Sequence, residues 1–236
     1  MSNLEKSPPA NQNRLLAALP GKEYDQLTPH MQKVSFEQGQ VLFEPNETIK
    51  YAYFPLEGVT SMVVMTQSGA SVEIGLVGRE GFVGFQPLLG IKIAPNRAII
   101  QIPGHSLRID SEKLKKVFDQ GGKLQSILHR QIQAQIVQMS QGAACNRLHE
   151  VNERLARWLL MMHDRTDSDK LPLTHEFLSQ MLGANRATVS LTAGIFQQAG
   201  LIRYSRGMVT ILNREGLEEI ACECYQIVKA EFDLEA

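Results

Sequence analysis

Residues 171–212 hold the side chains best suited to chemistry, and that chemistry is the binding of double-stranded DNA. Between residues 171 and 214 the sequence has four arginines and a single acidic residue, Glu176, in a chain whose formal net charge is −1. An arginine can donate two parallel hydrogen bonds to a guanine edge, or bind a backbone phosphate. The four are Arg186, Arg203, Arg206 and Arg214. A local excess of positive charge in a slightly acidic chain indicates a nucleic-acid partner for this segment.

Two short helices and a hairpin are predicted to position these arginines. Thr174 is a good N-cap for a first helix, and Gly183 can end it in the left-handed conformation. Asn185 can cap a second helix, which Gly200 ends. Each helix has one apolar face, built from Phe177, Leu178, Met181 and Leu182 in the first and from Val189, Ala193, Ile195 and Phe196 in the second. Strands at 201–204 and 208–212, joined at residues 205–207, complete the order of a winged helix-turn-helix.

In this motif the N-terminal end of the second helix enters the major groove. The residues expected at base edges or nearby phosphates are Asn185, Arg186, Ala187, Thr188, Ser190 and Leu191, with Thr174 and His175 at the start of the first helix. Arg186 can bind guanine, and Ala187 and Leu191 can contact a thymine methyl group. Arg203 and Arg206 lie on the hairpin, where phosphate is the natural partner. The alternative is an ordinary helical hairpin with a solvated basic face.

The first half of the chain has the pattern of β-structure. Residues 30–110 contain short β-branched and aromatic runs separated by glycine, proline and asparagine, which is typical of an antiparallel roll or barrel. Before them, residues 14–28 are predicted to form a short helix broken at Pro20 and Gly21, and after them Ser111 can cap another helix. We therefore expect an α+β chain with four parts. These are an N-terminal tail and short helix at 1–29, an antiparallel β-roll sensor domain at 30–120, a dimerisation helix at 121–145 and a winged helix-turn-helix domain at 146–236.

A long helix is predicted over residues 123–144. Its apolar side chains recur every three or four positions, at Leu124, Leu128, Ile132, Ile136, Met139 and Ala143. The other face is rich in glutamine, at positions 131, 133, 135, 138 and 141. Such a helix can pack on its own domain or pair with a second copy of itself. We favour pairing, because a β-roll and a small helical domain leave the helix exposed. A further helix is predicted at 148–163, a polar loop at 164–170, and a hinge at 145–150.

The three cysteines, Cys145, Cys222 and Cys224, are too few and too oddly placed for a disulfide framework. Three thiolates could bind a metal, but the sequence has no Cys-x-x-Cys pair and no nearby histidine to complete the ligand set. We therefore expect inert thiols and no metal. No apolar run approaches the length of a membrane span, and the polar N-terminus has no signal core, so we expect a cytoplasmic protein that does not contact a membrane.

The sequence resembles the Crp/Fnr family of bacterial regulators over about residues 30–225. Two segments carry the resemblance: YFPLEGVTSMVVMTQSGASVEIGLVGREGFVG in the predicted roll, and the more specific LTHEFLSQMLGANRATVSLTAGIFQQAGLI. The resemblance implies a cyclic-nucleotide-binding-like β-roll, a homodimer formed through the long helix, and a palindromic site on double-stranded DNA. It also implies that the bound regulator recruits or blocks RNA polymerase.

The chain departs from the family at the effector site. Nucleotide-binding members have a Gly-Glu pair that grips the ribose, where this chain has Gly84 and Phe85, and an Arg-Ser pair for the cyclic phosphate, where it has Asn96 and Arg97. Phenylalanine cannot accept a ribose hydroxyl, and a one-residue slip in a strand turns a side chain to the other face. We therefore expect no cyclic-nucleotide cofactor. The candidates for a small-molecule effector site of another chemistry are Arg79, Glu80, Gly84, Phe85 and Arg97, of which Arg97 could meet an anion.

Two other sensing chemistries of the family find little support in the sequence. An iron–sulfur type needs a cysteine cluster near the N-terminus, and none occurs there; haem would need a ligand such as His30 or His105. On the reading helix the family pattern often has Arg, Glu and a second Arg, whereas this chain has Arg186, Ala187 and Leu191. Each lost bidentate contact removes about 1–3 kcal/mol of discrimination, which predicts a different half-site.

Two other function classes fit the sequence less well. A β-roll oxygenase would need a His-x-His or His-x-Asp pair, which residues 30–110 lack, and no nucleophile elbow, Walker loop or dinucleotide fingerprint occurs. We expect Arg79 and Glu80 to form a turn ion pair. The second alternative is an effector-binding or protein-interaction module without specific DNA recognition, which would have no use for the arginines of the hairpin. In the favoured mechanism a signal at the GREGFVG turn moves the hinge and so the spacing of two reading helices.

Overall fold

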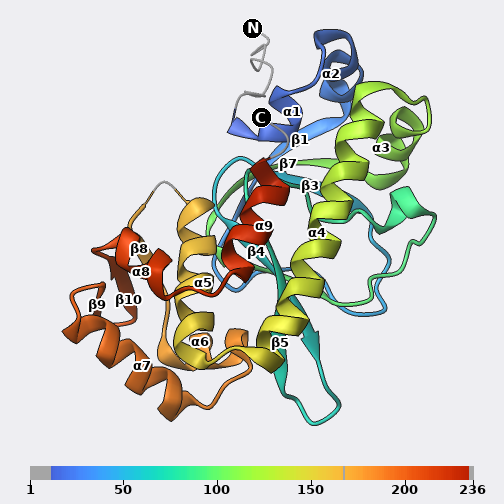
Figure 1. The fold of residues 1–236 in the computed structure, drawn as a ribbon. Coiled ribbons are helices and arrows are strands. Elements are labelled where there is room, and N and C mark those ends of the chain that lie inside the picture. The colour runs from blue at the N-terminus through green and yellow to red at the C-terminus, as the bar shows by residue number, and fades with distance from the viewer. Residues whose placement is uncertain (1–11, 167, 234–236) are drawn as a thin grey trace, which may run out of the picture.

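The computed structural model describes residues 12–166 and 168–233, so part of the predicted N-terminal tail lies outside the described residues. Figure 1 shows a β-rich N-terminal half, a long helix α4 (Gly122–Leu148) that runs past it, and a C-terminal half of helices with a small sheet. Within the described residues, no helix is both long and apolar enough to cross a membrane.

The β-roll consists of two antiparallel sheets. In the first, β7 (Gly104–Asp110) pairs with β1 (Met31–Phe36) and with β3 (Tyr51–Pro55). The second has the order β2 (Val41–Phe43), β6 (Arg97–Ile102), β4 (Val59–Met65) and β5 (Ser71–Val77). One buried cluster joins the two sheets, with Tyr53 from the first and Phe43 and Met62 from the second. The predicted antiparallel roll is therefore confirmed.

The turn between β3 and β4 shows why this sheet needs glycine. Gly58 has a φ of 80°, and a Cβ atom there would lie 2.5 Å from the carbonyl oxygen of Ile102. A side chain would both strain the backbone and collide with a neighbouring strand, so we expect only glycine to fit this turn.

Short helices close one end of the roll. The segment predicted as one broken helix forms α1 (Arg14–Ala17) and α2 (Gly21–Leu27), with the break at Pro20 as predicted, followed by a 3-10 turn at Thr28–His30. Helix α3 (Ser111–Phe118) packs its buried Leu114 against them. The predicted cap of α3 is wrong by one residue: the carboxylate of Asp110 accepts hydrogen bonds from the amides of Glu112 and Lys113, and Ser111 is already helical. A second 3-10 turn lies at Gln86–Leu89.

The long helix packs on its own chain over most of its length. Leu124, Leu128 and Ile132 are buried in the core of the roll. The prediction that a second copy pairs along the whole apolar stripe is therefore wrong for the N-terminal half of the helix. Most of the glutamine face is not solvated either, because Gln131, Gln135 and Gln138 are buried and only Gln133 is exposed. Gln135 donates to the carbonyl of Phe82, and Gln138 both donates to the carbonyl of Leu76 (3.0 Å) and accepts from its amide (3.2 Å). The exposed residues of α4 include His129, Gln133, Ile136, Ser140 and Ala143.

The C-terminal half is built around α5 (Val151–Asp164), which contributes the only tryptophan of the chain, Trp158, to its core. The hinge predicted at 145–150 contains the break between α4 and α5. Around α5 lie α6 (His175–Leu182), α7 (Arg186–Gln198) and a three-stranded sheet of order β8 (Lys170–Pro172), β10 (Met208–Ile211) and β9 (Ile202–Ser205). Sequence patterns did not predict β8, because the segment 164–170 was interpreted as a polar loop. Nor did they predict α8 (Arg214–Ile220) and α9 (Cys224–Asp233). Figure 1 shows α9 beside α4 and α5, which it contacts.

A buried carboxylate joins the roll to the C-terminal half. The indole nitrogen of Trp158 donates to Glu73 of β5 (2.7 Å), which also accepts from the hydroxyl of Ser61 (2.7 Å). Burial of its carboxylate raises the pKa of Glu73 to about 7, although these two hydrogen bonds and the charges of Arg157 and Arg165 oppose the rise. The protein therefore holds a carboxylic acid that is half-protonated near neutral pH at the junction of its two halves.

Glu73 makes stability depend on pH. Its folded-state pKa of about 7 lies above the unfolded value of 4.5, so the folded state holds the proton more tightly. The resulting stabilisation is complete below the unfolded pKa and is lost as the pH rises to about 7. We expect Glu73→Gln, whose amide oxygen still accepts from Trp158 while its amide nitrogen donates to the hydroxyl of Ser61, to lack this loss, which is at most about 3 kcal/mol in the wild type. Urea unfolding from about pH 5 to about pH 8, followed by Trp158 fluorescence, measures it. Parallel pH profiles of the two proteins would contradict the prediction.

Candidate nucleic-acid interface

The helix-turn-helix forms with the predicted caps. The hydroxyl of Thr174 accepts from the amide of Phe177 (3.1 Å), and the side chain of Asn185 accepts from the amide of Ala187 (2.8 Å). Gly183 ends α6 with a φ of 56°. These three local predictions are confirmed, and together they set the angle between α6 and α7.

One face of α7 is open to solvent from its first residue onward. Asn185, Arg186, Ala187 and Thr188 are exposed, and Leu191 is 68% exposed. The prediction that Ile195 belongs to the buried side is wrong, because its side chain is 55% exposed. Thr192 is buried in its place and donates to the carbonyl of Thr188, which satisfies the hydroxyl within the helix. Leu191 and Ile195 are therefore apolar side chains on this face that are available to contact another molecule.

Arg186 lies at the start of this face. Its guanidinium is 3.0 Å from the carboxylate of Glu176 in α6, and both side chains are more than half exposed. An exposed pair of this kind contributes little to stability, because solvent screens the charges. Arg186 is therefore free to exchange Glu176 for another acceptor without loss to the fold.

His175 and Ser190 have a structural contact instead of a free surface. The Nδ1 atom of His175 lies 2.9 Å from the hydroxyl of Ser190, and its ring stacks on Tyr204 of β9 with centroids 4.0 Å apart. Burial and, to a smaller extent, the charge of Arg186 lower the pKa of His175. These contacts tie α6, α7 and the hairpin together, so the two residues hold the open face of α7 in place. Their direct contact with DNA stays a prediction.

The hairpin of β9 and β10 carries the basic wing. Arg203 and Arg206 are exposed, and Arg206 (φ 51°) and Gly207 (φ 76°) form its tight turn. Thr210 pairs with Arg203 on one side and with Lys170 of β8 on the other, so the two cations share one face of the sheet. Lys170 was missed by the sequence patterns because its strand is only three residues long.

Arg214 does not belong to this surface. Its guanidinium contacts Asp164 (2.7 Å) and Glu218 (2.9 Å), and it also donates to the hydroxyl of Tyr225. It therefore joins α5, α8 and α9 through partly buried ion pairs. Counting Arg214 in the positive charge of the interface is therefore wrong. Lys170 is the fourth cation of that surface, beside Arg186, Arg203 and Arg206.

Four of the predicted effector-site residues, Glu80, Gly84, Phe85 and Arg97, have different surroundings. Arg97 donates to Glu44 (2.8 Å), and Phe85 packs into the core cluster that contains Leu88. Gly84 has a φ of 88°, and a Cβ there would lie 2.8 Å from the carbonyl oxygen of Tyr51. Glu80 has a partner that the sequence did not predict, namely Arg165 just after α5 at 2.8 Å.

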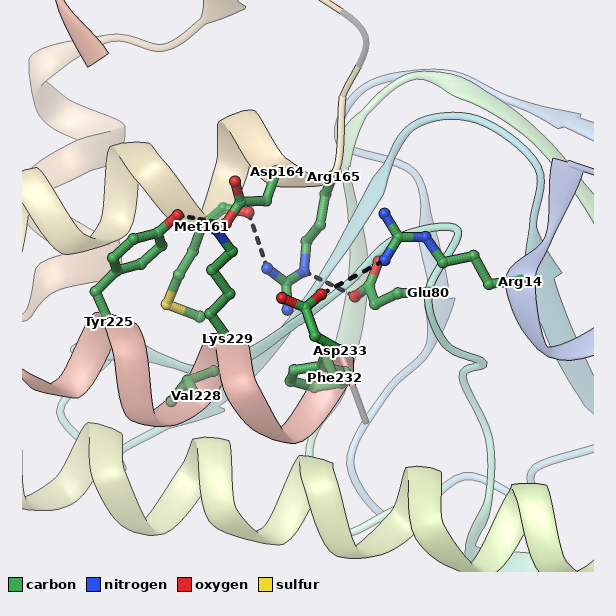
Figure 2. A pocket seen from close by; sticks show the side chains of 10 residues that line it. All are labelled: Arg14, Glu80, Met161, Asp164, Arg165, Tyr225, Val228, Lys229, Phe232 and Asp233. Atoms are coloured by element: carbon green, nitrogen blue, oxygen red, sulfur yellow. Dashed lines mark hydrogen bonds and ion pairs between the residues drawn. The ribbon is translucent and has the colours of Figure 1, made fainter. Parts of the chain in front are cut away.

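Figure 2 shows the pocket in which Glu80 and Arg165 meet. Their side chains are only 6% and 5% exposed, and Arg165 also donates to the carbonyl of Met161 (2.8 Å). Phe232 of α9 lies under the guanidinium, 5.1 Å from ring centroid to Cζ. Glu80 and Arg165 therefore line this pocket and form a second buried polar contact between the roll and the C-terminal half, in addition to that of Glu73.

One group of residues could hold a metal. Cys145, His149, Cys222 and Cys224 each place a ligand atom within 4.8 Å of the others. The expectation that no histidine lies near the cysteines is therefore wrong, because the end of α4 brings His149 to them.

Two family models match the chain, and together they cover about two thirds of it. A cyclic nucleotide-binding domain matches residues 33–121, and a Crp-like helix-turn-helix domain matches residues 153–220. Their order along the chain is that of the roll and the open-faced helix-turn-helix described above.

Curated relatives match over most of their own length. The transcriptional regulator SdrP of Thermus thermophilus is 26% identical over 200 residues, which is 83% of this chain and 96% of that protein. The fumarate and nitrate reduction regulatory protein of Escherichia coli is 25% identical over 207 residues, covering 84% of this chain and 82% of that protein.

Solved structures share the fold. A transcriptional regulator of the Crp/Fnr family from Eubacterium rectale superposes with a TM-score of 0.70 at 16% identity, over 89% of this chain and 98% of that one. A regulator of the same family from Thermus thermophilus has a TM-score of 0.66 at 22% identity, over 80% of this chain and 98% of that one.

The different surroundings of two arginines predict different consequences of their loss. We expect Arg214→Ala to lower the free energy of unfolding by about 1–3 kcal/mol, because the partly buried Asp164 and Glu218 lose their charged partner and only the hydroxyl of Tyr225 still donates to Asp164. Arg203→Ala, an exposed matched control, should change it by less than about 0.5 kcal/mol. Urea unfolding followed by Trp158 fluorescence compares the two, and equal losses would show that the Arg214 contacts carry no stability.

Proposed function

The chain belongs to the Crp/Fnr family of transcription regulators, and from that premise we propose that it binds a palindromic DNA site as a homodimer with α7 in the major groove. The observation that carries this proposal is the open N-terminal face of α7. Arg186, Ala187, Thr188 and Leu191 are exposed there, while Val189 of the same helix is fully buried.

The side chains of this face suit direct reading of bases. Arg186 would leave Glu176 and donate two hydrogen bonds to the O6 and N7 atoms of a guanine, and Leu191 would contact a thymine methyl group. The wing cations Arg203, Arg206 and Lys170 would bind phosphates and so fix the register of α7 on the duplex.

The exposed side of α4 is the surface proposed for the dimer. Ile136 is 48% exposed in the middle of this side, between Gln133 and Ser140. Because α4 leads into the hinge and then into α5, pairing along α4 would set the two copies of α7 in successive major grooves, about 34–36 Å apart.

The effector is proposed to be something other than a cyclic nucleotide. Phe85 packs into the core where nucleotide-binding relatives use a glutamate, and Glu44 already neutralises Arg97. We place the protein in the cytoplasm with its DNA, and we propose RNA polymerase as the partner that it recruits or blocks there.

Selection of bound sequences from random duplex DNA tests the proposal, using the purified protein with no ligand added. A palindrome with half-sites about one helical turn apart is the expected product. If neither the protein alone nor the protein with cell extract enriches any sequence, specific DNA binding is contradicted.

Arg186→Ala should remove base specificity. We expect it to flatten the preference at one guanine of each half-site by about 1–3 kcal/mol, because the forked contact is lost. Arg206→Ala should instead weaken binding to all sequences alike and lower the slope of affinity against salt by about one unit. Repeating the selection and the salt titration with both variants separates the two roles. Unchanged sequence preference in Arg186→Ala would contradict the assignment of α7 as the reading helix.

Ile136→Glu should separate the proposed dimer, because it brings two carboxylates together near the twofold axis. We expect the dimer dissociation constant to rise at least about tenfold, which corresponds to about 1.4 kcal/mol. Sedimentation equilibrium measures it. Ile91→Glu is the matched control, because Ile91 is 57% exposed on the roll, away from α4. If both variants stay dimeric, the dimer does not use this face.

A further inference from the structure

Three cysteines and one histidine from two distant parts of the chain meet at the hinge. Cys145 lies in the last turn of α4, and His149 is the residue that follows this helix. Cys222 lies between α8 and α9, and Cys224 is the first residue of α9. All three cysteines are free and buried, with relative exposures of 0%, 5% and 0%.

The distances within this cluster match those of a tetrahedral metal site. With Zn–S bonds of about 2.3 Å, two thiolate sulfurs lie about 3.8 Å apart, and a sulfur and an imidazole nitrogen about 3.6 Å apart. Here the Sγ atoms of Cys145 and Cys222 are 3.5 Å apart, and the Sγ atom of Cys224 is 3.5 Å from Nδ1 of His149. All four ligand atoms lie within 4.8 Å of one another, which leaves room for one ion at their centre.

Neighbouring side chains orient two of these four groups as they do around metal ions. Nε2 of His149 lies 3.3 Å from the carboxylate of Glu223, so its other nitrogen is turned toward the sulfurs. A carboxylate on the far nitrogen of a ligand histidine is the usual outer contact of zinc sites. Gln141 of α4 donates a hydrogen bond to the Sγ atom of Cys224 (3.2 Å).

The charges around the cluster suit a metal ion that is bound by three thiolates. Three thiolates and one divalent cation carry a net charge of −1, which is costly to bury without a partner. Arg154 and Arg157 of α5 lie close enough to interact electrostatically with Cys145. The side chain of His149 is 17% exposed, so the cluster is not sealed and an ion can reach it.

We propose that Cys145, His149, Cys222 and Cys224 bind one Zn²⁺ ion in a closed tetrahedral site. Three soft thiolates and one imidazole are a ligand set that structural zinc sites use, and four protein ligands leave no open position for catalysis. A disulfide between Cys145 and Cys222 would involve only two of the four converging groups. It would not account for the contact between His149 and Glu223.

The ion would tie the DNA-binding half to the long helix. Cys145 and His149 lie at the C-terminal end of α4, whereas Cys222 and Cys224 lie at the start of α9, which packs along α4 and α5. Metal binding would therefore fix the hinge on which the position of α7 depends. This consequence for DNA binding rests on the proposed function, but the metal site itself does not.

Metal analysis of the reduced, full-length protein tests the site. We expect about one equivalent of zinc per chain and, after replacement by Co²⁺, the visible absorption of a tetrahedral cobalt–thiolate centre. Cys145→Ser, Cys222→Ser, Cys224→Ser and His149→Asn should each lower zinc affinity at least a hundredfold, measured by competition with a chromophoric chelator. Glu223→Gln, which keeps all four ligands, should lower it by about tenfold to a hundredfold.

Two matched controls should leave zinc affinity unchanged. His105→Asn removes another histidine that lies near a glutamate, 3.9 Å from Glu57, and Glu219→Gln removes an exposed carboxylate close to the cluster in sequence. Circular dichroism of each variant without metal shows whether it is folded. If a cysteine variant does not fold, the zinc affinity of Glu223→Gln tests the site in its place.

Three results would overturn the site: a reduced protein that takes up neither Zn²⁺ nor Co²⁺, equal zinc affinity in Cys224→Ser and the wild type, or equal affinity in Glu223→Gln and Glu219→Gln. The effect on DNA is measured separately with the selected duplex. We expect chelation to weaken binding at least tenfold in the wild type. Zinc binding without any effect on DNA affinity would overturn only the coupling. Zinc binding in a protein that enriches no DNA sequence would overturn the proposed function and leave the site intact.

Discussion

The register of α4 on the roll is the constraint on which the rest of the structure depends. The buried amide of Gln138 hydrogen-bonds both backbone groups of Leu76, and that of Gln135 bonds the carbonyl of Phe82. A buried amide without partners costs about 1–3 kcal/mol, so sliding the helix by one residue would break several bonds at once. The same buried side of the helix carries Cys145 two turns after Gln138. The place of the hinge, and of everything beyond it, is therefore set by hydrogen bonds made in the first half of the chain.

Local signals predicted local structure well. The caps at Thr174 and Asn185 and the left-handed Gly183 depend only on neighbouring residues, and all three were predicted correctly. Periodicity was less informative for α4, because it identifies an apolar face without saying what covers it. It failed for Ile195 because an exposed apolar residue on a binding face has the same pattern as a buried one, whereas Thr192 hides its hydroxyl by bonding within its own helix.

The parts of the site that the sequence did not reveal are those made by distant segments. Arg186 and Leu191 could be found because α7 alone displays them. His149 lies more than 70 positions from Cys222, and only the packing of α9 on α4 brings them together. Lys170 joins Arg203 through a strand too short to have a pattern of its own. Arg214 shows the reverse error, because its charge was counted as surface charge although Asp164 and Glu218 hold it inside.

The contacts along α5 connect the two halves of the structure. Its N-terminal end follows the hinge with the cysteine cluster, Trp158 in its middle bonds Glu73, and Arg165 just beyond its C-terminal end bonds Glu80. Glu73 belongs to β5 and Glu80 to the loop that follows it, so these two contacts of α5 and Arg165 come from one short stretch of the roll. A ligand that displaced residues 73–80 would break the contacts of Glu73 with Trp158 and of Glu80 with Arg165, whereas the N-terminal end of α5 would stay attached at the hinge. Such a ligand would shift the position of α7 only if it bound the displaced arrangement more tightly than the one described here.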